Sequence, residues 1–352
     1  MRYVSFFILF SLLLSCNKKK TEPSVSSSVI TQSGMLVLCE GLFQQNNSSL
    51  SWVNLDDGSV ENQYFLNQNG RLLGDTGNDL AEYGSKVYVV VNVSSTIEVL
   101  DKSSLTSLKQ IDMKSNGVPK SPRKIKFHNG LGYITCYDGY VDVLDTNSLE
   151  IIARIKVGEN PEDLTFSNEK MYVTNSGGLN VPDVDSTVSV INITTNDELK
   201  KITVGKNPGG IVTDSEGDVY VISRGNYGSI PSRMVRVNSV SDEVEQTFSF
   251  NASGITKMDA NFLIRYSDFN TLSGTVNLFD PLSETIIQSD FLDMSQFTTL
   301  YSISYNFVNQ KIICTDAMSY TNSGYVKVFN SQGVFEKSYH VGLNPNSIVF
   351  YE

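Results

Sequence analysis

The sequence predicts an all-β fold, a seven-bladed β-propeller made of four-stranded blades. A phrase of the form Val-Gly-x-Asn-Pro recurs at 157–161, 204–208 and 341–345, each time before an apolar run. The first two copies begin 47 residues apart, from Val157 to Val204, a spacing that fits one blade. Only 18% of the residues are charged, and Val, Ile, Thr and Tyr are abundant, which favours strands over helices.

The N-terminus has the pattern of an export signal. An apolar run from Val4 to Leu14 ends in Leu-Leu-Ser-Cys at Cys16, and it is too short to span a bilayer. This order resembles a bacterial lipoprotein signal, which implies a signal peptide at 1–15, cleavage before Cys16 and lipidation of that cysteine. An ordinary secretory signal is the alternative. Because Asn17 is not the aspartate that commonly retains such proteins at the inner membrane, we expect a lipid anchor in the outer membrane. Both sides of that membrane stay open, since no acidic run of the kind many surface-exported lipoproteins carry follows Cys16; the cell surface is favoured over the periplasmic face.

The remaining chain divides into a tether and one domain. Residues 16–33 contain the expected lipidated cysteine and a Ser/Thr/Pro-rich stretch without alternation, so we expect a flexible tether there. Residues 34–352 then form the propeller. The formal net charge of −11 argues against a nucleic-acid partner, and either solubility or a cationic ligand would account for it.

The blade from 161 to 204 is the clearest. Four strands are expected at 163–166, 170–174, 187–192 and 198–204. The third strand of each unit ends in Asp or Asn, which opens the turn to the outer strand by bonding its own backbone, so these residues are structural rather than catalytic. Similar units begin near Asp75, Pro119, Asn207, Asn251 and Gln296.

The seventh blade is split between the two ends of the domain. The last Asn-Pro is followed by an apolar run at 347–351, whereas the first strands after the tether, at 35–38 and 49–55, lack an innermost strand. Joining the C-terminal strand to the N-terminal blade closes the ring and removes an open sheet edge.

Three cysteines follow Cys16, and each lies near the end of an apolar run: Cys39, Cys136 and Cys314. Corresponding strands of different blades are usually too far apart for a disulfide, so we expect buried free thiols. A bridge between Cys39 and Cys314 is the alternative.

Several segments resemble the YncE-like (DUF5074) seven-bladed surface lipoproteins. They read Glu-Gly-Leu-Phe at 40–43, Asn-Gly-Arg-Leu-Leu-Gly-Asp-Thr at 69–76 and Lys-Val-Tyr-Val-Val-Val-Asn at 86–92. The chain departs from the family's opening by carrying Cys39 where Asn is usual. One branch, the BtuG lipoproteins, captures cobalamin and passes it to an outer-membrane transporter. The resemblance therefore implies a non-catalytic binding protein without a cofactor, with cobalamin as candidate ligand and a transporter as candidate partner.

A ligand is expected on one face of the propeller. Loops between the second and third strands and between successive blades lie on that face, and four of the former are long and contain aromatic residues. Arginines there can bind a phosphate, carboxylate or amide oxygen, or serve as structural ion-pair partners. The predicted ligand-binding residues are Arg71, Asn92, Arg123, Tyr137, Asn175, Arg224, Tyr227, Arg265, Tyr266, Phe269 and Tyr320.

Catalytic motifs are missing from the sequence. It has two histidines, His128 and His340, far apart in blade order, and no Cys-x-x-Cys, His-x-x-x-His, Gly-x-Ser-x-Gly or phosphate loop. A calcium site at Asp183 and Asp185 is less favoured than a solvated loop. We therefore predict neither a metal site nor an enzyme. The alternatives are a scaffold that binds protein or glycan and, less favoured, a propeller lyase or an enzyme that uses carboxylates.

Overall fold

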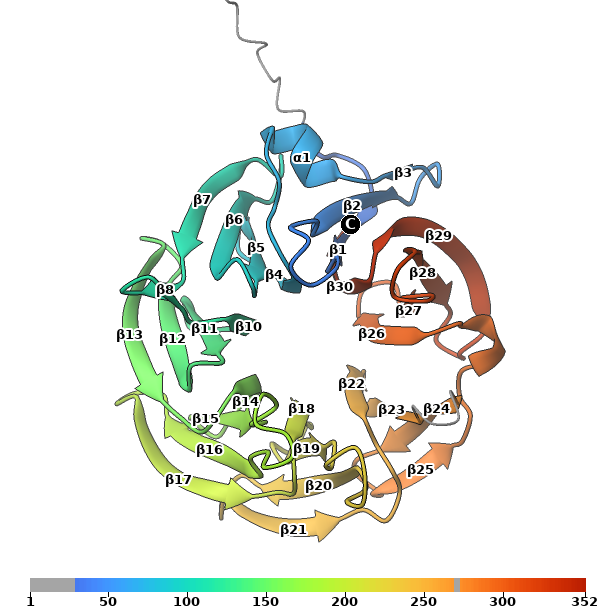
Figure 1. Ribbon diagram of the computed structural model, residues 1–352. Helices are drawn as coiled ribbons and strands as arrows, with labels where there is room; N and C mark the ends of the chain where they lie inside the picture. Colours follow the sequence, from blue (N-terminus) through green and yellow to red (C-terminus); the bar gives the residue numbers. More distant parts are fainter. Residues whose placement is uncertain (1–28, 269–272) are drawn as a thin grey trace, which may run out of the picture.

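Seven four-stranded antiparallel sheets form a ring in the computed structural model, which describes residues 29–268 and 273–352 (Figure 1). This arrangement confirms the predicted propeller. The expected signal peptide, Cys16 and most of the tether lie outside the described residues. The described residues contain two helices, α1 (Tyr64–Asn69) and the single-turn 3₁₀ helix η1 (Met294–Gln296). Within the described ranges, no helix is long and apolar enough to cross a membrane.

The blades are numbered around the ring, and the strands of each blade are given from the innermost, beside the channel, to the outermost. Blade 1 consists of β30 (Pro345–Tyr351), β1 (Gly34–Cys39), β2 (Ser49–Asn54) and β3 (Val60–Glu61). Blade 2 consists of β4 (Gly77–Tyr83), β5 (Lys86–Val91), β6 (Thr96–Asp101) and β7 (Ser107–Asp112). Blade 3 consists of β10 (Pro122–His128), β11 (Leu131–Cys136), β12 (Tyr140–Asp145) and β13 (Glu150–Lys156).

The other four blades follow the same order. Blade 4 consists of β14 (Pro161–Ser167), β15 (Lys170–Asn175), β16 (Thr187–Asn192) and β17 (Asp197–Thr203). Blade 5 consists of β18 (Pro208–Thr213), β19 (Val219–Ser223), β20 (Arg233–Asn238) and β21 (Glu243–Thr247). Blade 6 consists of β22 (Gly254–Met258), β23 (Asn261–Asp268), β24 (Ser273–Asp280) and β25 (Thr285–Gln288). Blade 7 consists of β26 (Leu300–Asn306), β27 (Lys311–Asp316), β28 (Ser323–Phe329) and β29 (Phe335–Leu343). A small hairpin, β8 (Lys114–Ser115) and β9 (Val118–Pro119), joins blades 2 and 3.

Ring closure follows the predicted route. The C-terminal strand β30 pairs antiparallel with β1, with Leu36 opposite Val349 and Gly34 opposite Tyr351. In Figure 1 the red β30 lies in one sheet with the blue β1 and β2. Both ends of the domain are therefore held in one sheet, and the ring has no free innermost edge at its junction.

Side chains from adjacent blades fill the spaces between them. The third residue of the second strand is tyrosine in β5 and β11, and each ring packs against a phenylalanine of the following blade. Tyr88 lies 4.8 Å from Phe127 and Tyr133 lies 5.3 Å from Phe166, measured between ring centroids. In β27 the same position is Ile313, which faces blade 1. At the junction between blades 7 and 1, an isoleucine therefore takes the place of the tyrosine ring that β5 and β11 supply at the junctions of blades 2 and 3 and of blades 3 and 4.

The predicted turn residues close their turns through their own side chains. The carboxylate of Asp145 accepts bonds from the backbone N–H groups of Asn147 and Ser148, at 2.8 and 2.9 Å. Asn192 does the same for Thr194 and Thr195. The structural interpretation of these strand-ending residues is therefore confirmed.

The three described cysteines are free and buried, so no bridge joins Cys39 to Cys314. Burial raises the pKa of the Cys39 thiol to about 11 and that of Cys136 well above its ordinary value. These thiols are inert core groups rather than nucleophiles.

Candidate functional site

The candidate site lies at the channel mouth, which is the end of the central channel where the innermost strands begin. Residues at one equivalent position of these strands surround it. This position is the second residue of six of the seven strands, and the pairing with the neighbouring strand shifts register at this residue in all six. Such bulges turn a side chain out of the regular alternation and are frequent beside binding sites. The six residues, called the mouth ring below, are Asn346, Asn78, Arg123, Glu162, Gly209 and Tyr301.

Glu162 is the centre of the polar contacts in the mouth ring. Its side chain is 8% exposed and accepts bonds from Arg123 Nη2 at 2.9 Å and from the Tyr137 hydroxyl at 2.5 Å, with Arg224 Nη2 at 3.4 Å. Arg123 also lies 4.7 Å above the Tyr137 ring. Burial alone would raise the pKa of Glu162, but Arg123 and Arg224 hold it well below its ordinary range. The carboxylate therefore stays ionised and is unsuited to proton transfer near neutral pH.

Two glycines leave room for arginines beside this cluster. A Cβ atom on Gly209 would lie 2.4 Å from Arg224 Cζ, and one on Gly254, the first residue of β22, would lie 3.2 Å from Arg265 Nε. Arg224 directly follows β19, and Arg265 lies within β23. In blades 5 and 6 the innermost strand has a glycine at this place. The space that a side chain would fill is occupied by an arginine that lies in the second strand or directly follows it.

A cavity of about 210 Å³ opens at this place, lined by residues of blades 3 to 7. Its wall includes Glu162, Arg224, Arg265, Tyr301 and Ser253. The Tyr301 hydroxyl donates to Glu40 Oε2 at 2.5 Å, and its ring packs edge-on against Tyr320 at 5.9 Å. Concave sites with a few convergent polar groups and aromatic rings are where small molecules bind.

The structure brings several of the sequence-predicted residues together and separates others. Arg123, Tyr137, Arg224, Arg265 and Tyr320 meet at the channel mouth. Asn92 lies close by, because its side-chain N–H₂ donates to the carbonyl of Pro122 at 2.9 Å.

The other predicted residues lie apart from this cluster. Arg71 pairs with the buried Glu98 of β6, at 2.8 Å to both carboxylate oxygens, away from the channel. Asn175 is fully buried and bonds Gly158, Thr187 and Ser189. Tyr227 is the exception: it is 61% exposed in the loop before β20 but close enough to Arg224 to interact with it electrostatically. Tyr266 pairs with Thr275 across β23 and β24. Phe269 lies outside the described residues.

Sequence reasoning missed Glu162, Tyr301, Glu40 and Asn78. One signal was available for the position. Each of the three repeated Asn-Pro phrases is followed directly by a mouth-ring residue: Glu162, Gly209 or Asn346. The phrase therefore places the bulge, and the residue after it points to the channel mouth.

The histidines and loop aspartates have structural surroundings. His128 stacks on Phe166 with ring centroids 4.9 Å apart, and His340 packs on Tyr325 at 5.0 Å. Asp185 accepts bonds from the backbone N–H groups of Ser186 and Thr187. In the described part of the chain, no group of three or more His, Cys, Asp or Glu could hold a metal ion.

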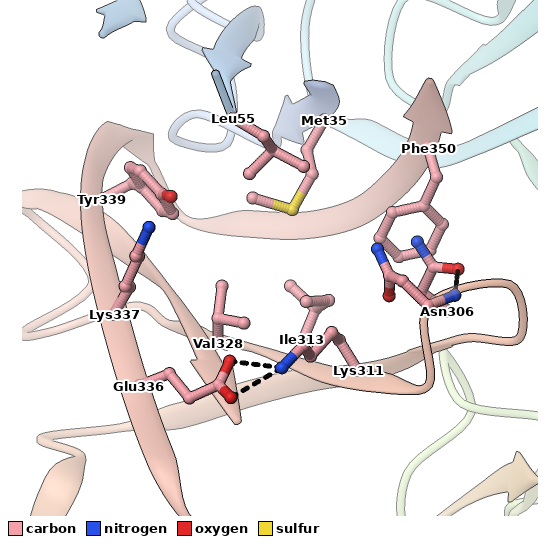
Figure 2. A pocket seen from close by; sticks show the side chains of 11 residues that line it. Met35, Leu55, Asn306, Lys311, Ile313, Val328, Glu336, Lys337, Tyr339 and Phe350 are labelled. Carbon is pink, nitrogen blue, oxygen red and sulfur yellow. Dashed lines mark hydrogen bonds and ion pairs between the residues drawn. The ribbon is translucent and has the colours of Figure 1, made fainter. Parts of the chain in front are cut away.

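A second cavity, of about 280 Å³, lies at the junction of blades 7 and 1 (Figure 2). Its wall includes Met35, Ile313, Val328 and Phe350, and a Lys311–Glu336 ion pair of 2.6 Å lies at its edge. Asn306 and Lys311 flank the β26–β27 turn, so this cavity is at the end of the blade opposite to the channel mouth. At this cavity Lys311 and Glu336 pair with each other, Lys337 is the other charged side chain, and much of the remaining wall is apolar. The wall at the channel mouth instead gathers Glu162, Arg224 and Arg265 beside the Tyr301 ring. We therefore take the channel mouth as the candidate site.

Solved structures with a similar fold have different functions. One is a Bacteroides thetaiotaomicron quinonprotein alcohol dehydrogenase-like protein, with a TM-score of 0.67, 13% identity and 90% of this chain and 78% of that chain covered. Another is Kuenenia stuttgartiensis hydrazine synthase, with a TM-score of 0.63, 13% identity and 77% and 88% covered. A third is the computationally designed Ika8 protein, with a TM-score of 0.58, 13% identity and 91% and 92% covered.

At such low identity these similarities establish the fold alone. No curated protein matches the sequence. Residues 33–261 match a family described as a domain of unknown function, DUF5074, and the chain belongs to this family.

Proposed function

We propose that this protein is a non-catalytic binding protein, anchored in the outer membrane by a lipid on Cys16, which captures a small molecule at the channel mouth. The observation that carries the proposal is the convergence of Arg224, Arg265 and Tyr301 on the wall of one cavity, with Tyr320 packed edge-on against Tyr301. Arg265 and Tyr301 lie on strands and Arg224 directly follows one, while Tyr320 lies in the loop between β27 and β28, where it packs against Tyr301. Binding therefore needs little reorganisation, which favours affinity.

Cobalamin is the candidate ligand, supported by the resemblance to the BtuG branch. Its corrin ring carries amide groups and its nucleotide loop a phosphodiester, all of which accept hydrogen bonds from arginine. Tyr320 is 43% exposed and packs on Tyr301, so it offers a ring face or edge on which a large planar ligand can rest. After capture, contact with an outer-membrane transporter would pass the ligand on.

Calorimetric titration of the purified protein with cyanocobalamin tests this proposal. We expect saturable one-to-one binding that Tyr320→Ala weakens by about 1 kcal/mol, the size of a lost aromatic contact. Phe307→Ala is the matched control, because Phe307 is a 57% exposed aromatic residue of the same blade in the turn at its opposite end. No heat of binding and no shift in melting temperature would exclude cobalamin.

Binding of a protein or glycan is the second candidate function. Large apolar side chains are exposed on the loops that surround the mouth: Phe43 at 67%, Leu179 at 70%, Val181 at 59% and Tyr227 at 61%. Exposed apolar groups around a polar centre are common at protein interfaces. A transporter that co-purifies with the protein, and is lost from a Phe43→Ser, Leu179→Ser double variant, would support this function. Unchanged recovery from that variant would contradict it.

A further inference from the structure

Among the described residues, Glu162 is the one acid that forms an ion pair with any of the three arginines of the channel mouth, Arg123, Arg224 and Arg265. Glu40, also close by, accepts a hydrogen bond from the Tyr301 hydroxyl at 2.5 Å. Glu162 pairs with Arg123 at 2.9 Å, Lys124 pairs with Asp79 at 3.0 Å, and Lys126 pairs with Asp163 at 2.9 Å. Arg224 reaches only the already paired Glu162, at 3.4 Å. Arg265 forms no ion pair with any described residue, and residues 269–272, Phe-Asn-Thr-Leu, contain no acid that could supply one.

Arg265 is held in place by backbone rather than by charge. Its Nη1 donates to the carbonyl oxygens of Leu300 and Tyr301, at 3.1 and 2.5 Å. Among the described residues, no hydrogen bond uses its Nη2 or Nε. These contacts fix the guanidinium on the wall of the cavity and leave two of its donor groups available.

Arg224 lies close enough to Arg265 for the two charges to repel. The pKa of Arg265 is lowered first by its burial and then by the charge of Arg224. Two neighbouring arginines whose one acidic contact, Glu162, is already paired with Arg123 cost free energy in the unliganded protein, since their charges are only partly compensated. That cost is recovered when an anion enters, because it pairs with both charges at once.

The size of the cavity limits what can enter. Its volume of about 210 Å³ is larger than a phosphate or carboxylate group needs but lies below the roughly 300–1,000 Å³ of pockets that enclose drug-sized ligands. A phosphate or carboxylate group therefore fits inside, and the remainder of a larger ligand would lie above the mouth, beside Tyr320.

We propose that Arg224 and Arg265 together bind an oxyanion, the phosphate or carboxylate group of a ligand whose remaining part lies over the channel mouth. This inference rests on the proposed function, because both use the same site. Arginine suits this role, since its planar fork of donors matches the two oxygens of a phosphate or carboxylate.

The test uses the full-length purified protein with sodium phosphate and sodium acetate as probes, each compared with sodium chloride at equal ionic strength. We expect at least one of the two probes to raise the melting temperature in a saturable way. The probe that does so tells a phosphate ligand from a carboxylate ligand. Arg265→Gln should weaken this binding by about tenfold or more, the loss expected for charge-assisted hydrogen bonds.

Arg233→Gln is the matched control. Arg233 begins the third strand of blade 5 and forms no ion pair among the described residues, so its removal should leave anion binding unchanged. If Arg265→Gln does not fold, Arg224→Gln and Arg265→Lys replace it, and the lysine variant should retain part of the affinity because it keeps the charge but not the fork. Equal responses to phosphate, acetate and chloride, or unchanged anion binding by the arginine variants, would overturn the inference.

Failure of the inference can be told apart from failure of the proposed function. Cyanocobalamin that binds the wild type and the Arg224→Gln and Arg265→Gln variants equally would leave the binding function intact and reject the oxyanion site. Anion binding that depends on both arginines, without binding of cyanocobalamin, would support the oxyanion site and reject cobalamin as the ligand.

Discussion

Replacing Glu162 by glutamine tests whether the mouth ring is held together by a buried charge. The substitution keeps the size of the side chain but leaves Arg123 and Arg224 without a negative partner. The Glu162 side chain is 8% exposed and that of Arg123 is 21% exposed, so water compensates little. Removing one partner of a buried ion pair costs about 3–5 kcal/mol. We expect Glu162→Gln to lower the free energy of unfolding by an amount in that range.

The pH dependence of this loss has a defined sign. Although burial favours the neutral acid, Arg123 and Arg224 hold the folded-state pKa of Glu162 far below its ordinary value of 4.5. A depressed pKa stabilises the fold fully above the unfolded-state pKa, and this stabilisation is lost as the pH falls toward the folded-state pKa. The difference between wild type and Glu162→Gln should therefore be constant around neutral pH and shrink below pH 4.5.

Urea unfolding followed by the fluorescence of the only tryptophan, the buried Trp52, measures both effects. Glu169→Gln is the control, because Glu169 is exposed in the turn of the same blade at its opposite end and undergoes the same chemical change. A Glu162→Gln variant as stable as the control, or a stability difference that does not change between neutral pH and about pH 3.5, would refute the reasoning.

Three other predictions concern the core. Deletion of residues 347–352 removes most of β30 and its pairing with β1, and should abolish cooperative thermal unfolding; a truncated protein with an unchanged melting temperature would contradict this. Ile313→Phe should fill the junction cavity and raise the free energy of unfolding by about 1 kcal/mol through added apolar burial, whereas a lower urea midpoint would show that the cavity cannot accept a ring. Iodoacetamide should alkylate the buried thiols of Cys39, Cys136 and Cys314 only after unfolding. Alkylation of any of the three in the native protein, mapped by mass spectrometry, would disprove their burial.

The fold could be predicted from the sequence because each blade repeats the same local chemistry. Asp145 and Asn192 close equivalent turns, and the Asn-Pro phrases precede the innermost strands β14, β18 and β30. The split blade also followed from the pattern, since a C-terminal run without partners met an N-terminal blade that lacked its innermost strand. Local patterns that recur in every blade need no long-range information to be recognised.

The candidate site was less accessible, since its contacts join distant parts of the sequence. Arg123 lies 39 residues from Glu162 and Arg224 lies 62 residues from it, and neither spacing is a motif. Arg71 has the same residue type but pairs with Glu98, 27 residues away in another strand. Residue type thus identified candidates, but only the register shifts of the innermost strands determine which of them reach the channel.

The position of the cavity follows from departures from the repeat. Blades 1, 2, 3, 4 and 7 place a side chain at the shifted second residue of the innermost strand, whereas blade 5 has Gly209 there and β22 of blade 6 has no register shift. The space left by these two blades is taken by Arg224, which directly follows β19, and Arg265, which lies in β23. Arg224 shares Glu162 with Arg123, at 3.4 Å against 2.9 Å, and Arg265 forms no ion pair with a described residue. A ring with the same side chain in every blade would close its mouth symmetrically. The asymmetry of blades 5 and 6 is what leaves an open, positively charged cavity on one side of the channel, and it is where a ligand's anionic group should be sought.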